Sequence, residues 1–185
     1  MTSLSNKQLT SVREAKQRVN IWDGSIRSGK TVASMVSWIL FCNSSRGSAG
    51  ELVMIGRTRD AVWRNVIGPL MDPSLMGIVA EAVEGNYGAP TVRVLGERVF
   101  VMGANDIKAE AVLRGLTVRG VYVDEITVLP ENFFAQLLGR MSPRGARLFG
   151  TTNPDNPHHW LKTKYLDRNL PNWARWHFLI EDNPY

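Results

Sequence analysis

The segment that is most informative about this chain reads Gly24-Ser25-Ile26-Arg27-Ser28-Gly29-Lys30-Thr31. It meets in full the pattern G-x-x-x-x-G-K-[ST], in which glycines let the backbone wrap and point its N–H groups at phosphate oxygens. The run Val19-Asn20-Ile21-Trp22 before it is β-prone, and residues 31–42 after it have the apolar spacing of a helix. A strand, a phosphate-binding loop and a helix in this order predict a P-loop nucleotide-binding fold.

The loop residues are candidates for binding the phosphates of a nucleotide such as ATP. The ammonium of Lys30 suits the β- and γ-phosphates, and the hydroxyl of Thr31 suits Mg²⁺. The N-terminus of the following helix adds a partial positive charge. Arg27 is a candidate to reach the γ-phosphate within the same subunit; the alternative is a surface arginine that pairs elsewhere. The alternative for the whole loop is a glycine turn before a helix, with Lys30 solvated.

A second pattern is an apolar run that ends in two acids, Gly120-Val121-Tyr122-Val123-Asp124-Glu125. This is the pattern of a Walker B strand, in which Asp124 would hold the Mg²⁺ shell and Glu125 would polarise the attacking water. Apolar runs that end in acids are also common at ordinary strand ends, so the pattern gains force from the P-loop before it. The adjacent glutamate favours a hydrolytic motor ATPase over a kinase or a GTPase switch.

Other strand and helix signals alternate along the chain. Strands are predicted at 52–56, 147–150 and 176–180, a hairpin at 91–102 around Gly96-Glu97, and helices at 5–18, 60–70 and 130–138. This alternation predicts a layered α/β fold with a mostly parallel central sheet. The 185 residues suit one compact domain.

The composition gives only weak information about the binding partners of the protein. The net charge of +5 mildly favours a polyanion such as nucleic acid, although such a surplus is ordinary for 185 residues. Cys42 is the only cysteine, so no internal disulfide is possible. Residues 1–18 lack the apolar segment of a signal peptide, and the apolar run at 35–42 is too short to span a bilayer. We therefore expect no membrane partner.

Three ordered features carry a family resemblance. The first is the arginine-bearing P-loop directly after a strand, and the second is Leu113-Arg114-Gly115-Leu116 ahead of the acidic strand. The third is Gly150-Thr151-Thr152-Asn153-Pro154 after the next strand. In these features the chain resembles the ATPase domain of the phage terminase large subunit, the DNA-packaging motor. Its tail is similar to the segment that leads into the family's linker region, which places residues 156–185 at the start of a linker.

The resemblance implies roles for further residues. Arg114 is similar to the arginine finger that is presented to a neighbouring subunit, and the alternative is a solvated turn residue. Thr151, Thr152 and Asn153 are similar to the coupling motif that senses the γ-phosphate. Such groups at a strand's carboxyl end are well placed to bind ligand in an open α/β sheet, but an ordinary turn is an equal alternative. Gln8 is similar to a glutamine that contacts adenine in some terminases.

The resemblance implies a P-loop ATPase of the additional-strand, catalytic-glutamate class, built in three layers. Its expected activity is Mg²⁺-dependent ATP hydrolysis that drives viral double-stranded DNA into a procapsid. Expected partners are that DNA, a homo-oligomeric ring on a viral portal, and the terminase small subunit, in the host cytoplasm during virion assembly. Large terminases usually continue into a nuclease, which is not expected in this chain. Alternatives are another DNA-directed motor, such as a helicase or recombination ATPase, and a non-hydrolysing ATP-binding assembly module.

Overall fold

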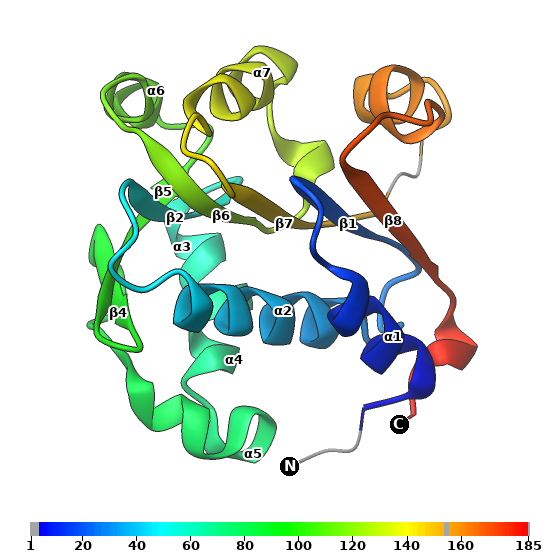
Figure 1. Ribbon diagram of the computed structural model, residues 1–185, viewed down its shortest axis with the longest axis horizontal. Coiled ribbons are helices and arrows are strands. Elements are labelled where there is room, and N and C mark those ends of the chain that lie inside the picture. The colour runs from blue at the N-terminus through cyan, green and yellow to red at the C-terminus, as the bar shows by residue number, and fades with distance from the viewer. Residues whose placement is uncertain (1–3, 154–155, 185) are drawn as a thin grey trace.

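The computed structural model describes residues 4–153 and 156–184 of the chain. In this part an eight-stranded sheet runs through the centre, with helices on both faces (Figure 1). The strands are β1 (Val19–Gly24), β2 (Glu51–Gly56), β3 (Val83–Glu84), β4 (Thr91–Val94), β5 (Glu97–Gly103), β6 (Val118–Val123), β7 (Arg147–Thr152) and β8 (Trp173–Phe178). Their order across the sheet is β3-β4-β5-β2-β6-β7-β1-β8.

The sheet is mostly parallel, as predicted. All neighbouring pairs from β5 to β8 are parallel, and only the β3–β4 and β4–β5 pairs are antiparallel. β7 lies between β1, which leads into the P-loop, and β6, which leads to Asp124. This inserted strand is the feature that names the additional-strand class, and it confirms the predicted fold.

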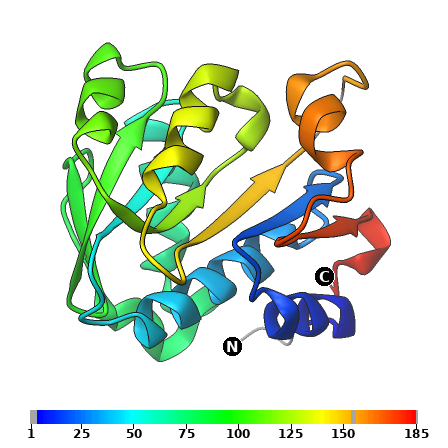
Figure 2. The same ribbon diagram turned by 45° about the horizontal axis from the view of Figure 1, so that its top comes forward.

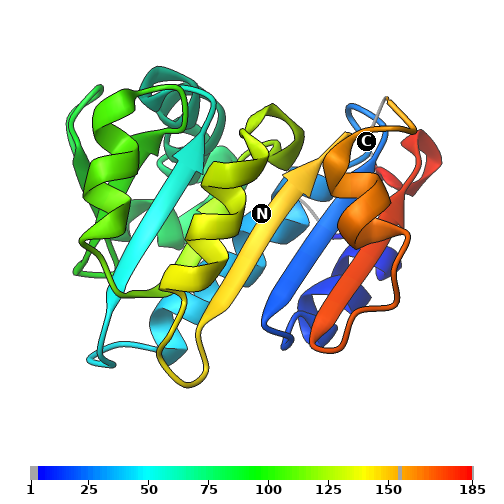
Figure 3. The ribbon, with the colours of Figure 1, turned by 90° about the horizontal axis from the view of Figure 1, so that it is seen from above.

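Helices cover the two faces of the sheet. One face carries α1 (Asn6–Glu14), α2 (Lys30–Ser44) and the helical run α3 (Arg59–Val62), η1 (Trp63–Ile67), α4 (Gly68–Leu70), α5 (Pro73–Met76) and η2 (Gly77–Ala82). The other carries α6 (Ile107–Arg114), α7 (Glu131–Arg140) and η4 (Lys162–Leu166), seen from above in Figure 3. The short turns η3 (Ile126–Val128) and η5 (Ile180–Asp182) follow β6 and β8. None of the described helices is long and apolar enough to cross a membrane.

Two apolar cores lie against the two faces because successive strand residues point to opposite sides. In β1, Trp22 belongs to the core under α2, and its neighbour Ile21 belongs to the core under α7. Trp38 of α2 packs edge-on against Phe149 of β7, with ring centroids 6.0 Å apart. Trp22, Trp38 and Trp63 all lie in this core, and each is at most 2% exposed.

Some element boundaries differ from the prediction. Asp124 and Glu125 follow β6 instead of ending it. The hairpin turn is formed by Leu95 and Gly96, both at positive φ (53° and 80°), which suits the twist of the flanking strands. The last strand ends at Phe178, two residues before its predicted end. It pairs in register with β1, and this pairing ends where Gly24 lies opposite Phe178. Helix α6 was not predicted, since its eight residues are too few to show a clear period.

Candidate active site

The P-loop connects β1 to α2 at the carboxyl edge of the parallel strands. Gly24 has a φ of 125°, and a β-carbon there would lie 1.9 Å from the carbonyl oxygen of Phe178 on β8. The N–H of Ser25 donates to the same carbonyl at 2.9 Å. Gly29, with a φ of 81°, directly precedes α2. Glycine at these two positions therefore lets the loop turn tightly against β8 and then begin the helix.

Lys30 is the first residue of α2, and its ammonium folds over the loop. Nζ donates to the carbonyl oxygens of Gly24 at 3.0 Å and Ser25 at 3.1 Å, and Lys30 is only 7% exposed. The hydroxyl of Ser28 is buried in the loop and has no hydrogen-bond partner in the described part of the chain. Buried hydroxyls are normally paired, so this one, beside an ammonium and a helix N-terminus, suits an anionic group such as a phosphate.

Asp124 lies half-buried at the same carboxyl edge. Burial raises the pKa of its carboxyl above the ordinary value, and a hydrogen bond at 3.1 Å from the side-chain amide of Asn65 acts against that rise. Asp124 and the half-buried Thr31 of α2 offer the oxygen ligands that Mg²⁺ prefers. Residues 4–153 and 156–184 contain no cluster of three or more His, Cys, Asp or Glu that could hold a metal. Mg²⁺ held on nucleotide phosphates needs only one or two carboxylates.

Asn65 is a site residue that sequence reasoning missed. It lies in η1, a π-helix in the run that follows β2, and such turns are frequent at functional sites. Gly56 ends β2, and a β-carbon there would lie 2.9 Å from a methyl carbon of Val62 and 3.7 Å from the β-carbon of Asp124. Glycine therefore lets this helical run approach Asp124. A lone asparagine in a predicted helix gives no signal that it meets an acid 59 positions later.

Glu125 brings the predicted Walker B and coupling motifs together. Its backbone is left-handed, with φ 57° and ψ 79°, which is uncommon for a residue other than glycine. Its Oε1 accepts hydrogen bonds from the hydroxyl of Thr127 (2.5 Å), the hydroxyl of Thr152 (3.3 Å) and the N–H of Asn153 (2.6 Å). Its N–H donates to the hydroxyl of Thr151 at 3.1 Å. Thr127 is a further partner that sequence reasoning missed.

The predicted coupling motif also adjoins the strand that leads into the P-loop. Thr152 is paired in register with Asp23, the residue before Gly24. Thr151 and Thr152 are both buried, at 2% and 0% exposure. Pro154, the last residue of the predicted motif, lies outside the described residues. The ends of β1, β7 and β6 thus form one continuous edge that carries the loop, the threonines and the two acids.

Two further candidates, Arg27 in the P-loop and Gln8 on α1, lie at the outer side of the loop and beside it. Arg27 is exposed and left-handed, with a φ of 62°, and its carbonyl accepts a hydrogen bond from the side chain of Asn183 at 2.7 Å. Gln8 is 2% exposed and donates from Nε2 to the carbonyl of Gly29 at 2.9 Å. Gln8 therefore lies beside the loop, and its contact with adenine stays a prediction.

Arg114 lies away from these groups. It ends α6, where its side chain is 62% exposed, pairs with Glu110 at 2.7 Å and donates to Gln136 of α7 at 3.3 Å. The chain from Arg114 to Glu125 runs the length of β6, and six strand residues span roughly 20 Å. An arginine side chain cannot bridge that distance, so Arg114 does not reach Glu125 of the same chain.

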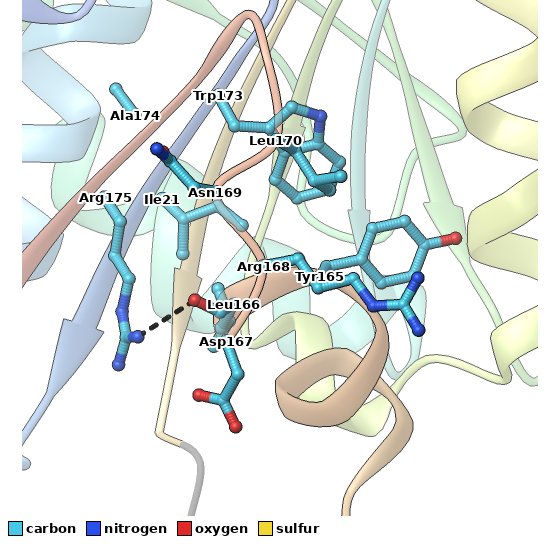
Figure 4. A pocket seen from close by; sticks show the side chains of 10 residues that line it. All are labelled: Ile21, Tyr165, Leu166, Asp167, Arg168, Asn169, Leu170, Trp173, Ala174 and Arg175. Atoms are coloured by element: carbon cyan, nitrogen blue, oxygen red, sulfur yellow. Dashed lines mark hydrogen bonds between the residues drawn. The ribbon is translucent and has the colours of Figure 1, made fainter.

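A pocket of about 420 Å³ lies beside β8 and is lined by residues other than those of the P-loop. Figure 4 shows its lining, which comes from Ile21 of β1, from η4, from the segment after η4 and from β8. One lining residue, Arg175, donates to the carbonyl of Leu166 and also holds the buried carboxylate of Asp23 at 3.0 and 2.7 Å. His177 contacts the same carboxylate at 3.0 Å. Arg175 and His177 of β8 therefore hold Asp23, which directly precedes the P-loop.

Comparison with solved structures gives close matches over nearly all of this chain. The large terminase of a thermophilic bacteriophage matches with 30% identity and a TM-score of 0.84, over 98% of this chain and 47% of that chain. The same terminase in complex with ATP-gamma-S matches with 28% identity and a TM-score of 0.75, over 98% and 46%. The chain thus spans about half the length of that terminase.

A more distant match shares the fold. The ATPase domain of the large terminase of Thermus phage P74-26 has 16% identity and a TM-score of 0.67, over 95% of this chain and 80% of that chain. No sequence profile of a known family and no curated protein matches the chain.

Proposed function

The chain belongs to the family of phage large-terminase ATPase domains, and on this premise we propose that it hydrolyses ATP with Mg²⁺ to drive viral double-stranded DNA into a procapsid. The observation that carries the proposal is the contact between Glu125 and the pair Thr152 and Asn153, at the edge that also holds the P-loop. A carboxylate held against a phosphate-sensing motif is what a hydrolytic motor requires.

The proposed nucleotide site uses the loop and the two flanking oxygen ligands. The backbone N–H groups of residues 24–31 and the ammonium of Lys30 bind the phosphates, and Arg27 reaches the γ-phosphate from the exposed side of the loop. Thr31 and Asp124 hold the Mg²⁺, which when bound neutralises charge on the β- and γ-phosphate oxygens.

Glu125 is the proposed general base. Its Oε1 accepts three hydrogen bonds and is thereby engaged by the protein. We therefore assign Oε2 to the proton of the attacking water. Because Thr152 and Asn153 hold Oε1, any shift at the end of β7 moves this carboxylate. This link would couple release of the γ-phosphate in the active site to movement of the rest of the motor.

The proposed assembly is a homo-oligomeric ring on the viral portal, with the terminase small subunit and double-stranded DNA as partners, in the cytoplasm of the infected cell. Arg114 supports the ring because its exposed side chain lies beyond reach of its own Glu125. In a cyclic ring, one face of each subunit meets a different face of its neighbour. There Arg114 would neutralise charge that develops on the neighbour's γ-phosphate.

A concentration series of Mg²⁺-dependent ATP hydrolysis, with and without portal and linear DNA, tests the proposed function. We expect the rate per subunit to rise with protein concentration and with portal, because one subunit does not complete the site. Absence of turnover under every condition would leave only a non-hydrolysing nucleotide-binding module. Strand unwinding without packaging would indicate a helicase.

Mixing two inactive variants tests the shared site. We expect Arg114→Ala and Glu125→Ala rings each to be nearly inactive, because every site lacks one group. In a random 1:1 mixture about one site in four combines an intact Glu125 with a neighbour's intact Arg114, so activity should partly return. Arg140→Ala, at the exposed end of α7, is the matched control and should stay active. No recovery in mixed rings shown by native mass spectrometry would contradict the role in trans.

A further inference from the structure

Two side-chain amides from opposite ends of the chain donate hydrogen bonds to the P-loop backbone. Asn183, after η5, donates from Nδ2 to the carbonyl of Arg27 at 2.7 Å. Gln8, on α1, donates from Nε2 to the carbonyl of Gly29 at 2.9 Å. Figure 2 shows α1 and the last described segment lying close together at one end of the sheet. Neither residue belongs to the nucleotide-binding motif itself.

The geometry of the peptide bond gives these contacts a consequence. In a planar trans peptide, the carbonyl of one residue and the N–H of the next point in opposite directions. A carbonyl of Arg27 that is held by Asn183 therefore turns the N–H of Ser28 away from Asn183. A carbonyl of Gly29 that is held by Gln8 likewise turns the N–H of Lys30 outward from the start of α2, where anions bind.

We propose that Asn183 and Gln8 are positioning residues that hold two P-loop peptides with the N–H groups of Ser28 and Lys30 facing the nucleotide phosphates. This inference rests on the nucleotide site proposed above and adds the residues that shape it. Asn183 should have the larger effect on the loop. The carbonyl of Gly29 is held by the N–H of Ala33 in α2 as well as by Gln8, so it depends less on its side-chain partner.

The backbone of Arg27 supports this assignment. Its φ of 62° is left-handed, a conformation that is unfavourable for a residue other than glycine. Such a conformation persists only where surrounding contacts hold it. Within the described residues, the hydrogen bond from Asn183 is the side-chain contact recorded to that peptide. Asn183 thus holds the loop in a conformation that its own sequence does not favour.

The two amides are parts of one braced unit. Asp182 accepts from the ammonium of Lys7 at 2.6 Å and from the N–H of Leu179 at 2.8 Å, which ties η5 to α1. The other end of the Gln8 amide, Oε1, accepts from the N–H of Ser5 at 2.7 Å as part of the α1 capping box. Both ends of that amide are therefore occupied, and a contact with adenine would require Gln8 to give up one of them.

The test measures affinity for ATP-gamma-S by calorimetry and turnover at saturating ATP. Asn183→Leu keeps the branched shape of the side chain but removes the amide donor. We expect the dissociation constant to rise about tenfold, as for the loss of one hydrogen bond from the N–H of Ser28 to a charged phosphate. The maximal rate should stay within about twofold of wild type, because Thr152 and Asn153 still hold Glu125 in place once ATP is bound. Gln8→Met should show the same pattern with a smaller rise.

Two controls separate positioning from stability. Asn132→Leu removes an exposed asparagine on α7 and should change neither quantity. Ser5→Ala weakens the cap of α1 without touching Gly29, so it should lower the melting temperature more than the affinity. If wild type binds ATP-gamma-S and folded Asn183→Leu and Gln8→Met bind it equally well, the positioning role is wrong. If wild type itself does not bind, the proposed function fails instead.

Discussion

Replacing Glu125 with glutamine should lower the maximal rate of ATP hydrolysis about 100- to 1,000-fold and leave nucleotide affinity close to wild type. Glutamine keeps an oxygen that can accept the hydrogen bonds of Thr127, Thr152 and Asn153. It loses the negative charge that accepts a proton from water. The substitution therefore removes the base and preserves the contacts around it, so the loss should fall on the chemical step.

The measurement is steady-state ATP hydrolysis together with ATP-gamma-S binding, under conditions in which wild type turns over. Glu81→Gln is a matched control, because Glu81 is an exposed glutamate of η2. It should behave as wild type in both assays. A Glu125→Gln variant that retained more than half of the wild-type rate would assign the base to another group.

Replacing Gly24 with alanine should lower the free energy of unfolding by about 3 kcal/mol or more and also weaken nucleotide binding. A methyl group at this position would lie 1.9 Å from the carbonyl oxygen of Phe178, so β1 and β8 would have to separate. The hydrogen bond from Ser25 to the same carbonyl would then be lost. The φ of 125° adds strain, because side chains other than glycine rarely adopt it.

A Gly47→Ala variant separates the cost of the close contact at Gly24 from the cost of a positive φ. Gly47 also has a positive φ, 72°, but nothing lies within 4 Å of the position its β-carbon would take. Its substitution should cost only about 1 kcal/mol, from backbone strain alone. Urea unfolding followed by circular dichroism measures both costs. Equal losses in the two variants would mean that β1 and β8 do not approach each other so closely at Gly24.

Local patterns were enough for the elements that flank the motifs. The strand before the P-loop, the helix after it and the strand ahead of Asp124 each carry an apolar run or period that nearby residues specify. Such signals are weaker for α6, whose eight residues make little more than two turns. The π-helix η1 has no composition of its own, and it went unrecognised within a correctly predicted helical stretch.

The nucleotide-binding and acidic motifs could thus be read along the chain, because each needs particular residue types at short, fixed spacings. The contacts that complete the site could not be predicted from the sequence in this way. Asn65 meets Asp124 from 59 positions away, and Asn183 meets Arg27 from 156 positions away. Those meetings depend on the order of strands and on which segments pack beside them. The P-loop could therefore be predicted from eight consecutive residues. Its backbone conformation depends on Gln8 and Asn183, which lie near opposite ends of the chain and meet only in the folded structure.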